Sequence, residues 1–501
     1  MTISFNEISP TIRVPLAYIE FDNSQAVTGT PQQIDNVLLL GQADMNGDKV
    51  NGSGALNVPV KISRSTQAIE LWGRGSMVAL MVEEFIADNP DAVLHVMAQG
   101  NGTGSAAAGT LTLSGTALSD GVLSVYIGGV RVQVSVAQGQ KGKAIADALA
   151  AAINTKLSLP VTAVSAAPGG SDVDETSSVV TLTARFISAH SVHDIRLNYY
   201  DGEITPQGLV VDIAYPETKA ANPDLADTIA AMGEMQYKHI VTPYLDAANL
   251  KLLGSELRDR WGPTKMSDGI AWSAHIGTLG EMSAFGQTRN DFLLTCTGIQ
   301  KAPESAYLWA ATLAAVGSKH LAIDPARPLQ SLALTRRLAP AVEDRLNMSE
   351  RNTLLYDGIA TVNVAAGDVV QIERQITTYR TNSYGDPDPS YLDVNTISTL
   401  SYLRYSTRVR ITQRFPRHKL ADDGTPISAG QAIATPKVVK TELLALGMEW
   451  LDAGLIENFD AFKAALIVER NKNDRNRLDV LCKPDLVNQF RIFAEQMQFI
   501  L

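Results

Sequence analysis

The sequence lacks the features that mark several classes of protein. Its only cysteines, Cys296 and Cys482, stand far apart without a neighbouring cysteine, which excludes a disulfide framework and a cysteine-based metal pair. No stretch reaches the roughly 18 uninterrupted apolar residues of a membrane span. The N-terminus has no basic segment followed by an apolar run, as a secretion signal would. We therefore expect a protein that is made and kept in the cytoplasm.

Charged residues make up 19% of the chain and hydrophobic residues 45%, which is the ordinary balance of a globular protein. The formal net charge of -11 repels phosphate backbones, so we expect no direct contact with nucleic acid. A chain of 501 residues exceeds what one hydrophobic core usually organises. We expect two to four domains.

Catalytic and metal-binding motifs are missing as well, since neither G-x-S-x-G nor H-E-x-x-H occurs. The best metal-like signal is His190 and His193 beside Asp194, but this segment has the pattern of a loop and no third ligand can be named. The run that starts at Asp44 begins like a calcium loop but lacks the glycine and glutamate such a loop requires, so a polar hairpin turn is expected there. We predict no catalytic, cofactor or metal site and no enzyme.

Apolar runs and helical faces alternate along two parts of the chain. Strands are expected at 36–42 and 92–99, with a helix between them that Ser76 caps. The rhythm resumes with strands at 239–244, 269–276 and 291–297, a helix marked by Leu250, Leu253 and Leu257, and an alanine-rich helix at 304–321. This order predicts an α/β core.

Residues 100–200 interrupt that core. The segment opens with the flexible sequence GNGTGSAAAG and has almost no bulky aromatic residue before Tyr199. Valines alternate with polar residues from Val130 to Val136, as in a half-buried strand. A helix at about 141–157 precedes further strands near Val161 and Val179. We predict a small α+β domain inserted in a loop.

The last third has a different character. Residues 402–419 carry five arginines and one lysine without an acid, and we expect an exposed strand there. A helix at 438–453 and a hairpin with strands at 464–469 and 478–481 follow. The first 25 or so residues contain Pro10 and Pro15 and are expected to form an extended arm. The final residues are amphipathic with either helical or strand periodicity, so the sequence does not decide between a helix and a strand there.

The sequence thus predicts a multidomain α/β and α+β protein. Its predicted parts are an N-terminal arm (1–25), a discontinuous α/β core (26–99 and 201–330), an inserted α+β domain (100–200), a C-terminal α+β domain (331–484) and a C-terminal arm (485–501).

The chain also resembles a known family. The opening ISFNEISPTIRVPLAYIEFDNSQA, the LLLGQ run at 38–42, GRGSM at 73–77, VYIGGVRVQVSVAQG at 125–139 and the ending KPDLVNQFRIFAEQMQFIL are similar to the sheath proteins of Mu-like contractile phages. The resemblance covers essentially the whole chain. It implies a virion subunit, assembled in the host cytoplasm, that polymerises helically around the tail tube and contracts to drive the tube through the host envelope for genome delivery.

The resemblance also implies partners and contact residues. The partners would be further copies of the chain, the tail tube protein, and baseplate and tail terminator proteins, without nucleic acid, membrane insertion or cofactor. Terminal arms would add strands to a neighbouring subunit's sheet through Ile3, Phe5, Ile12, Val14, Leu16, Phe490, Ile492, Phe493 and Phe499. The inserted domain would face outward and the C-terminal domain would lie nearest the tube.

On that reading the basic run offers a surface toward the tube or a neighbouring subunit, through Arg404, Arg408, Arg410, Arg414 and Arg417. The alternative for these arginines is internal ion pairing. For the whole chain, two other functions remain open: the sheath of a phage-derived device that carries no genome, such as a bacteriocin or secretion machine, and an α/β hydrolase.

Overall fold

The computed structural model describes residues 13–15, 17, 19, 33–167, 175–426 and 431–500. These residues divide into two units. The large unit contains Ile34–Ile323 and Leu329–Ile397, and the small unit contains Asp324–Pro328 and the chain from Ser398 onward. Each unit has hydrophobic cores of its own.

An eight-stranded sheet forms the centre of the large unit, with the order β17-β16-β15-β14-β13-β1-β5-β4. The six strands from β16 to β5 in this order run parallel, and the two edge strands are antiparallel to their neighbours. The strands are β1 (Asn36–Gln42), β4 (Val60–Ile62), β5 (Val93–Gln99), β13 (His239–Val241), β14 (Ile270–Gly277), β15 (Leu294–Gln300), β16 (Ala360–Ala365) and β17 (Val369–Arg374).

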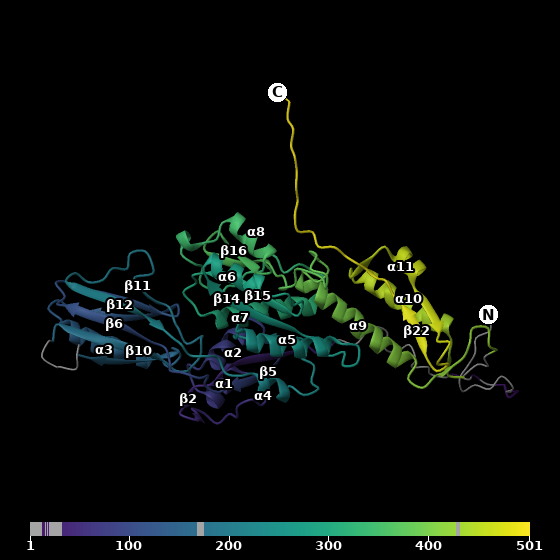
Figure 1. Cartoon of the computed structure of the whole chain (residues 1–501), viewed down its shortest axis with the longest axis horizontal. Helices are drawn as coiled ribbons and strands as arrows, with labels where there is room; N and C mark the ends of the chain where they lie inside the picture. Colours follow the sequence, from purple (N-terminus) through teal and green to yellow (C-terminus); the bar gives the residue numbers. More distant parts are fainter. Residues whose placement is uncertain are drawn as a thin grey trace. The chain divides into compact units, whose positions relative to one another are not determined.

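Helices cover both faces of this sheet, which explains why its central strands are almost continuously apolar (Figure 1). One face packs on α1 (Ser65–Trp72), α2 (Met77–Asp88) and α7 (Ala306–Ile323). The other packs on α4 (Ala226–Ala231), α5 (Ala247–Trp261), α6 (Leu279–Gln287) and α8 (Met348–Tyr356). The predicted α/β core is confirmed, and the predicted cap of α2 is present, since Ala79 N donates to Ser76 Oγ at 3.2 Å.

The inserted segment folds as two small sheets and one helix around a separate core (Figure 1). One sheet has the order β12-β6-β10-β9 and the other β11-β7-β8, and α3 packs on the apolar face of the first. The elements are β6 (Ala108–Gly115), β7 (Gly121–Ile127), β8 (Val130–Val136), α3 (Gly142–Thr155), β9 (Val161–Ala166), β10 (Ser177–Ala184), β11 (Ile195–Leu197) and β12 (Leu209–Glu217). The predicted strand at 130–136 and helix at 141–157 are confirmed.

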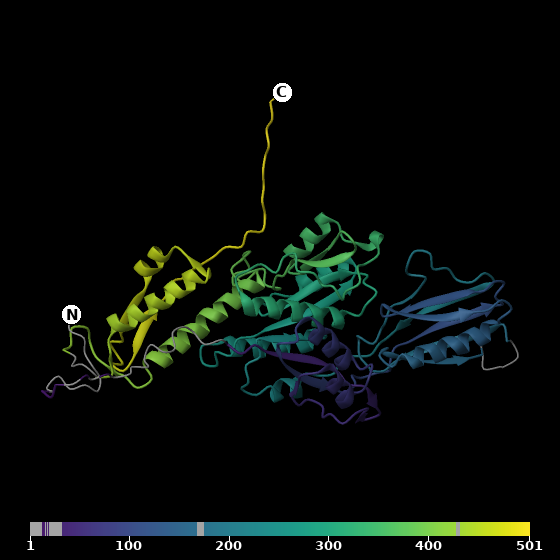
Figure 2. The same ribbon diagram turned by 180° about the vertical axis from the view of Figure 1, so that it is seen from behind.

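The small unit is built from helices and short two-stranded sheets (Figure 2). Helix α9 (Val394–Arg414) enters this unit at Ser398, and its core is closed by α10 (Pro436–Asp452) and α11 (Phe459–Ala465). The strand pairs are β18 (Lys419–Leu420) with β19 (Ile433–Ala434), β20 (Ile456–Glu457) with β23 (Asp485–Leu486), and β21 (Ile467–Arg470) with β22 (Leu478–Leu481). The helix predicted at 438–453 and the hairpin that follows it are confirmed.

The sheet extends further along the chain than the predicted boundary at residue 331. Both β16 and β17 belong to the large sheet, and the division between the two units falls at Ser398. Near the N-terminus, β2 (Met45–Asn46) and β3 (Lys49–Val50) pair antiparallel, which confirms the polar hairpin predicted after Asp44. A short 3-10 turn covers Val342–Asp344. None of the helices in the described ranges is a candidate for a membrane-crossing segment.

Candidate functional site

The carboxyl ends of the parallel strands are where α/β sheets usually bind ligands, above all where the strand order reverses. Here the order reverses between β1 and β13. At that point the fully buried Gln42 donates from Nε2 to Gly100 O at 3.0 Å and to Ile187 O at 2.8 Å. Two segments of the inserted domain are therefore held at the strand reversal, where Gly100 and Ile187 also line a pocket of about 640 Å³.

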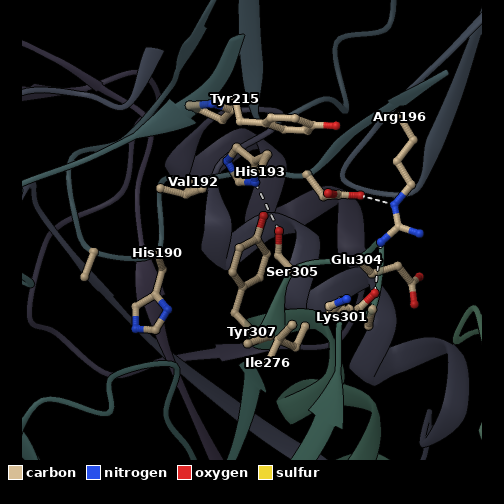
Figure 3. A pocket seen from close by; sticks show the side chains of 15 residues that line it. His190, Val192, His193, Arg196, Tyr215, Ile276, Lys301, Glu304, Ser305 and Tyr307 are labelled. Carbon is tan, nitrogen blue, oxygen red and sulfur yellow. Dashed lines mark hydrogen bonds and ion pairs between the residues drawn. The ribbon is translucent and has the colours of Figure 1, made fainter. Parts of the chain in front are cut away.

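A cavity of about 410 Å³ remains further along the same edge (Figure 3). One side of the cavity is lined by Ile276 near the end of β14 and by Lys301 directly after β15. The first turn of α7 and the residues just before it line a second side. The segment that precedes β11 forms the roof, so the cavity lies between the inserted domain and the core.

His193 is an almost fully buried polar side chain in the cavity wall. Its Nδ1 lies 3.0 Å from Ser305 Oγ, just before α7 (Figure 3). Its Nε2 is buried and has no hydrogen-bond partner among the described residues. Burial lowers the pKa of His193 to about 4, so the ring is neutral at physiological pH.

Charged groups gather on the opposite wall. Arg196 forms an ion pair with Asp194 and donates from Nη2 to Lys301 O at 2.9 Å (Figure 3). Glu304 Oε1 lies 3.3 Å from Nη1 of the buried Arg337. Burial raises the pKa of Glu304 to about 7 despite that pairing. His193 and Asp194 were singled out in the sequence, whereas Arg196, Ser305 and Lys301 carried no motif that would have drawn attention to them.

The rings of His190 and His193 have different surroundings. His190 packs its ring against Tyr244, with 6.2 Å between ring centroids, whereas His193 is held by Ser305. The described residues contain no group of three His, Cys, Asp or Glu side chains that could hold a metal ion.

The basic run is a helix, and the predicted strand at 402–419 is wrong. Helix α9 continues to Arg414, and one of its faces is buried through Leu403, Ser406 and Arg410 at helical spacing. Trp450 Nε1 in α10 donates to Ser406 Oγ at 2.9 Å. Ser406 and Arg410 on the buried face interrupt the apolar periodicity by which a helix is normally recognised.

Two arginines of this run form internal ion pairs with α10. Arg410 is buried, pairs with Glu449, and lies 3.6 Å from Glu442 Oε2 through Nη1. Arg414 Nε lies 3.6 Å from the same oxygen. Arg408 and Arg417 are exposed, and Arg404 is partly buried.

The C-terminal segment has neither helix nor strand from Asn488 to Ile500 and leaves its unit as an extended trace (Figures 1 and 2). Its apolar side chains are exposed, with fractions of 77% for Phe490, 82% for Ile492, 73% for Phe493 and 79% for Phe499. At the other terminus, Val14 is exposed by 62%. The other predicted contact residues of the N-terminal arm, Ile3, Phe5, Ile12 and Leu16, lie outside the described residues.

The hairpin of β21 and β22 is a sheet of only two strands among the described residues. Each of its strands therefore has a second edge whose main-chain groups no described strand pairs. Apolar side chains are exposed on both strands, at Ile467, Val480 and Leu481. An added strand would find main-chain partners and apolar contacts there.

Three family models match the chain. Residues 102–212 match the phage tail sheath protein beta-sandwich domain, residues 218–378 the phage tail sheath protein central domain, and residues 386–500 the phage tail sheath C-terminal domain. The match to the first of these coincides with the inserted domain.

A full-length relative is the Mu-like prophage FluMu tail sheath protein of Haemophilus influenzae, which is 44% identical over 503 residues and is covered over 100% of both chains. Among solved structures, the sheath tail protein Lin1278 from Listeria innocua is 13% identical, with 92% of this chain and 93% of that chain covered and a TM-score of 0.49. The helical sheath of the anti-feeding prophage in its contracted state is 8% identical, with 97% and 99% covered and a TM-score of 0.47.

Proposed function

This chain belongs to the phage tail sheath protein family, and we propose that it is the repeating subunit of a contractile tail sheath. Many copies surround the inner tail tube as a helical polymer, assembled in the host cytoplasm and carried in the virion. The polymer ends at a baseplate on one side and at a tail terminator protein on the other. Contraction drives the tube through the host envelope, and the genome follows.

The exposed C-terminal segment is the observation that carries this proposal. Folding of one chain leaves Phe490, Ile492, Phe493 and Phe499 in water, although burial of each such side chain is worth roughly 1.5–3 kcal/mol. A free subunit therefore holds unused apolar surface on an extended backbone. Insertion into a neighbouring copy satisfies both the side chains and the main chain.

The β21–β22 hairpin of a neighbouring copy is the acceptor that fits this segment. Its second strand edges can each take one added strand, and each main-chain hydrogen bond formed contributes roughly 0.5–1.5 kcal/mol net. The N-terminal arm would supply a second added strand. An arm that belongs to the chain of one subunit and is inserted into the next keeps the polymer connected while the subunits rotate relative to one another.

Contraction is then a repacking of rigid units between two sets of interfaces. The energy is stored at assembly, in the difference between those sets. The large and small units each keep their own cores, so neither has to refold.

The C-terminal domain is the part that faces the tube in this proposal, and the inserted domain faces outward. Residues 398–501 carry 15 Lys or Arg and 12 Asp or Glu, so this segment is net positive within a chain of charge -11. Since Arg410 and Arg414 are paired internally, Arg408 and Arg417 are the arginines of the run that would meet an acidic partner.

Negative-stain electron microscopy of the purified chain, alone and with the tube protein, tests the proposal. Striated hollow cylinders or rings are the expected products. Dispersed particles in both preparations would contradict it. The double variant Arg408→Glu/Arg417→Glu should form fewer cylinders on tubes, whereas unchanged assembly at low salt would remove the tube-facing role of these two residues.

A phage-derived device without a genome would use the same subunit mechanics. The two functions separate on whole particles rather than on the subunit. Particles purified from the source organism that contain a capsid and DNA identify a phage tail, and particles of sheath, tube and baseplate alone identify a device.

A further inference from the structure

Three asparagines of the chain directly precede a glycine, and the structure gives them different surroundings. They are Asn46, Asn51 and Asn101. An asparagine in this position can react with its own backbone, because glycine has no side chain to hinder the approach of its nitrogen to the neighbouring amide. The reaction requires that the side chain and the following peptide group are both free to move. Hydrogen bonds and packing at each pair therefore decide which of the three reacts.

Asn46 has this freedom. It is the last residue of β2, and Gly47 and Asp48 form the exposed turn to β3. The side chain of Asn46 forms no hydrogen bond within the described part of the chain, and the backbone nitrogen of Gly47 donates none there. A Cβ added to Gly47 would meet nothing within 4 Å, so the peptide between the two residues has open space around it.

Asn101 is held at both of its reacting groups. Its Oδ1 accepts a hydrogen bond from Ile187 N at 3.0 Å, and the nitrogen of Gly102 donates to Ile187 O at 2.7 Å. A Cβ added to Gly102 would lie 1.8 Å from Ala221 O, so this peptide has no room to turn. Because both hydrogen bonds must break first, the reaction at Asn101 should be slower by about tenfold or more.

The surroundings of Asn51 are intermediate. Its side chain is exposed, but Nδ2 donates to Asp44 Oδ2 at 3.2 Å and the backbone nitrogen donates to Asp44 O at 2.8 Å. A Cβ added to Gly52 would lie 2.4 Å from Leu71 O in the last turn of α1. The structure therefore gives an order of reactivity in which Asn46 is first, Asn51 second and Asn101 last.

We propose that Asn46 is a site of spontaneous deamidation. The nitrogen of Gly47 attacks Cγ of Asn46 and loses its proton through solvent to the departing side-chain amide, which leaves as ammonia. The product of this step is a cyclic succinimide. Water then opens the ring at either carbonyl and leaves aspartate or isoaspartate. The reaction needs no enzyme and no reactant other than water. This inference stands on the β2–β3 hairpin and does not depend on the proposed function.

Deamidation changes the charge and the backbone of the hairpin. Both products carry a carboxylate at residue 46, so each event makes the chain, with its net charge of -11, more negative by one charge. Isoaspartate also inserts a Cβ into the main chain, which disturbs the pairing of residue 46 with Lys49. Because Met45 and Val50 pack from this hairpin against the main core of the large unit, the isoaspartate form should loosen that packing.

Peptide mapping of the full-length chain measures the three sites separately after prolonged incubation at neutral pH and physiological temperature. Trypsin cleaves after Lys49, which lies between Asn46 and Asn51, so the two sites fall on different peptides. Mass spectrometry detects the replacement of the amide by a carboxyl group, and electron-transfer fragmentation distinguishes isoaspartate from aspartate. Digestion at mildly acidic pH prevents further deamidation during the digest.

The same chain unfolded in guanidinium chloride is the matched reference. The three sites should react there at similar rates, because each pair then has only its local sequence in common with the folded state. In the folded chain, Asn46 should be modified first, and about tenfold or more faster than Asn101. The variant Asn46→Gln retains an amide but must close a larger ring, so residue 46 should stay unmodified while Asn51 and Asn101 keep their rates.

Two results would overturn the proposal. One is an unmodified Asn46 in the folded chain after an incubation that modifies it in the unfolded chain, because the hairpin would then protect it. The other is modification of Asn101 in the folded chain at the rate of Asn46 or faster, because the hydrogen bonds to Ile187 would then offer no protection.

Discussion

Removal of the C-terminal segment should abolish self-assembly and leave the folded monomer intact. The sharpest form of this test ends the chain after Gln489. That cut keeps the hydrogen bond from Gln489 Nε2 to Ala326 O at 3.1 Å and removes the exposed apolar residues that follow it. The removed residues form no helix and pair with no strand among the described residues, so the melting temperature should hardly change.

The expected size of the effect follows from exposure. Phe493 and Phe499 are exposed by 73% and 79%, and burial of either against a neighbour would contribute roughly 1.5–3 kcal/mol. The single change Phe493→Ser should therefore raise the concentration needed for polymerisation by about one to two orders of magnitude. Truncation removes several such contacts together with the main-chain hydrogen bonds, and should prevent polymers at any accessible concentration.

Sedimentation of the polymer over a concentration series measures the threshold concentration for polymerisation directly. Electron microscopy shows what the pellet contains. Tyr384→Ser is the matched control, because Tyr384 is 89% exposed but belongs to the large unit and not to the arm. Cylinders of normal appearance formed by the truncated chain at the parent concentration would refute the role of the arm. An equal rise in threshold for Tyr384→Ser would attribute the effect to general surface polarity.

Three further outcomes concern the folded chain, and urea unfolding measures each of them. Arg410→Met should cost about 1–3 kcal/mol through loss of the ion pairs with α10, whereas the exposed Arg408→Met should stay within about 0.5 kcal/mol; equal costs would contradict the pairing. Burial lowers the pKa of His239 to about 4, and Trp272 Nε1 donates to its Nδ1 at 3.1 Å. The unfolded chain therefore binds the extra proton first, and this histidine should remove about 3 kcal/mol of stability as the pH falls from about 6.5 to 4, a loss that His239→Phe should lack. Gly317→Ala places a Cβ 2.3 Å from Trp272 Cη2 and should destabilise by about 1–3 kcal/mol, whereas Gly280→Ala meets nothing within 4 Å and should stabilise slightly; the reverse order would contradict the packing of α7 on β14.

Local pattern located most of the elements. The run from Asn36 to Gln42 was recognisable as a strand because a parallel strand covered on both faces must be apolar at nearly every position. Alternation from Val130 to Val136 marked a strand with one exposed face, and the predicted helices at 304–321 and 438–453 correspond to α7 and α10. Each of these signals depends only on neighbours in sequence.

The sequence pattern gave the wrong element or boundary where the buried side chains were polar or where their partners lay far away in the sequence. The arginine-rich segment is a helix whose buried face carries Ser406 and Arg410, and those side chains are buried only because Trp450 and Glu449 face them from α10. The domain boundary predicted at residue 331 differs from the division at Ser398, because only strand pairing assigns β16 and β17 to the large sheet.

The sequence by itself determined most of the elements, the inserted domain and the family resemblance, because apolar periodicity and motif identity are properties of contiguous residues. The tertiary structure alone decided which charges are compensated and where space remains. His193, Arg196, Ile276 and Ser305 line one cavity because the sheet brings the ends of β14 and β15 close to the inserted domain. No spacing in the chain encodes that meeting, since it depends on strand order.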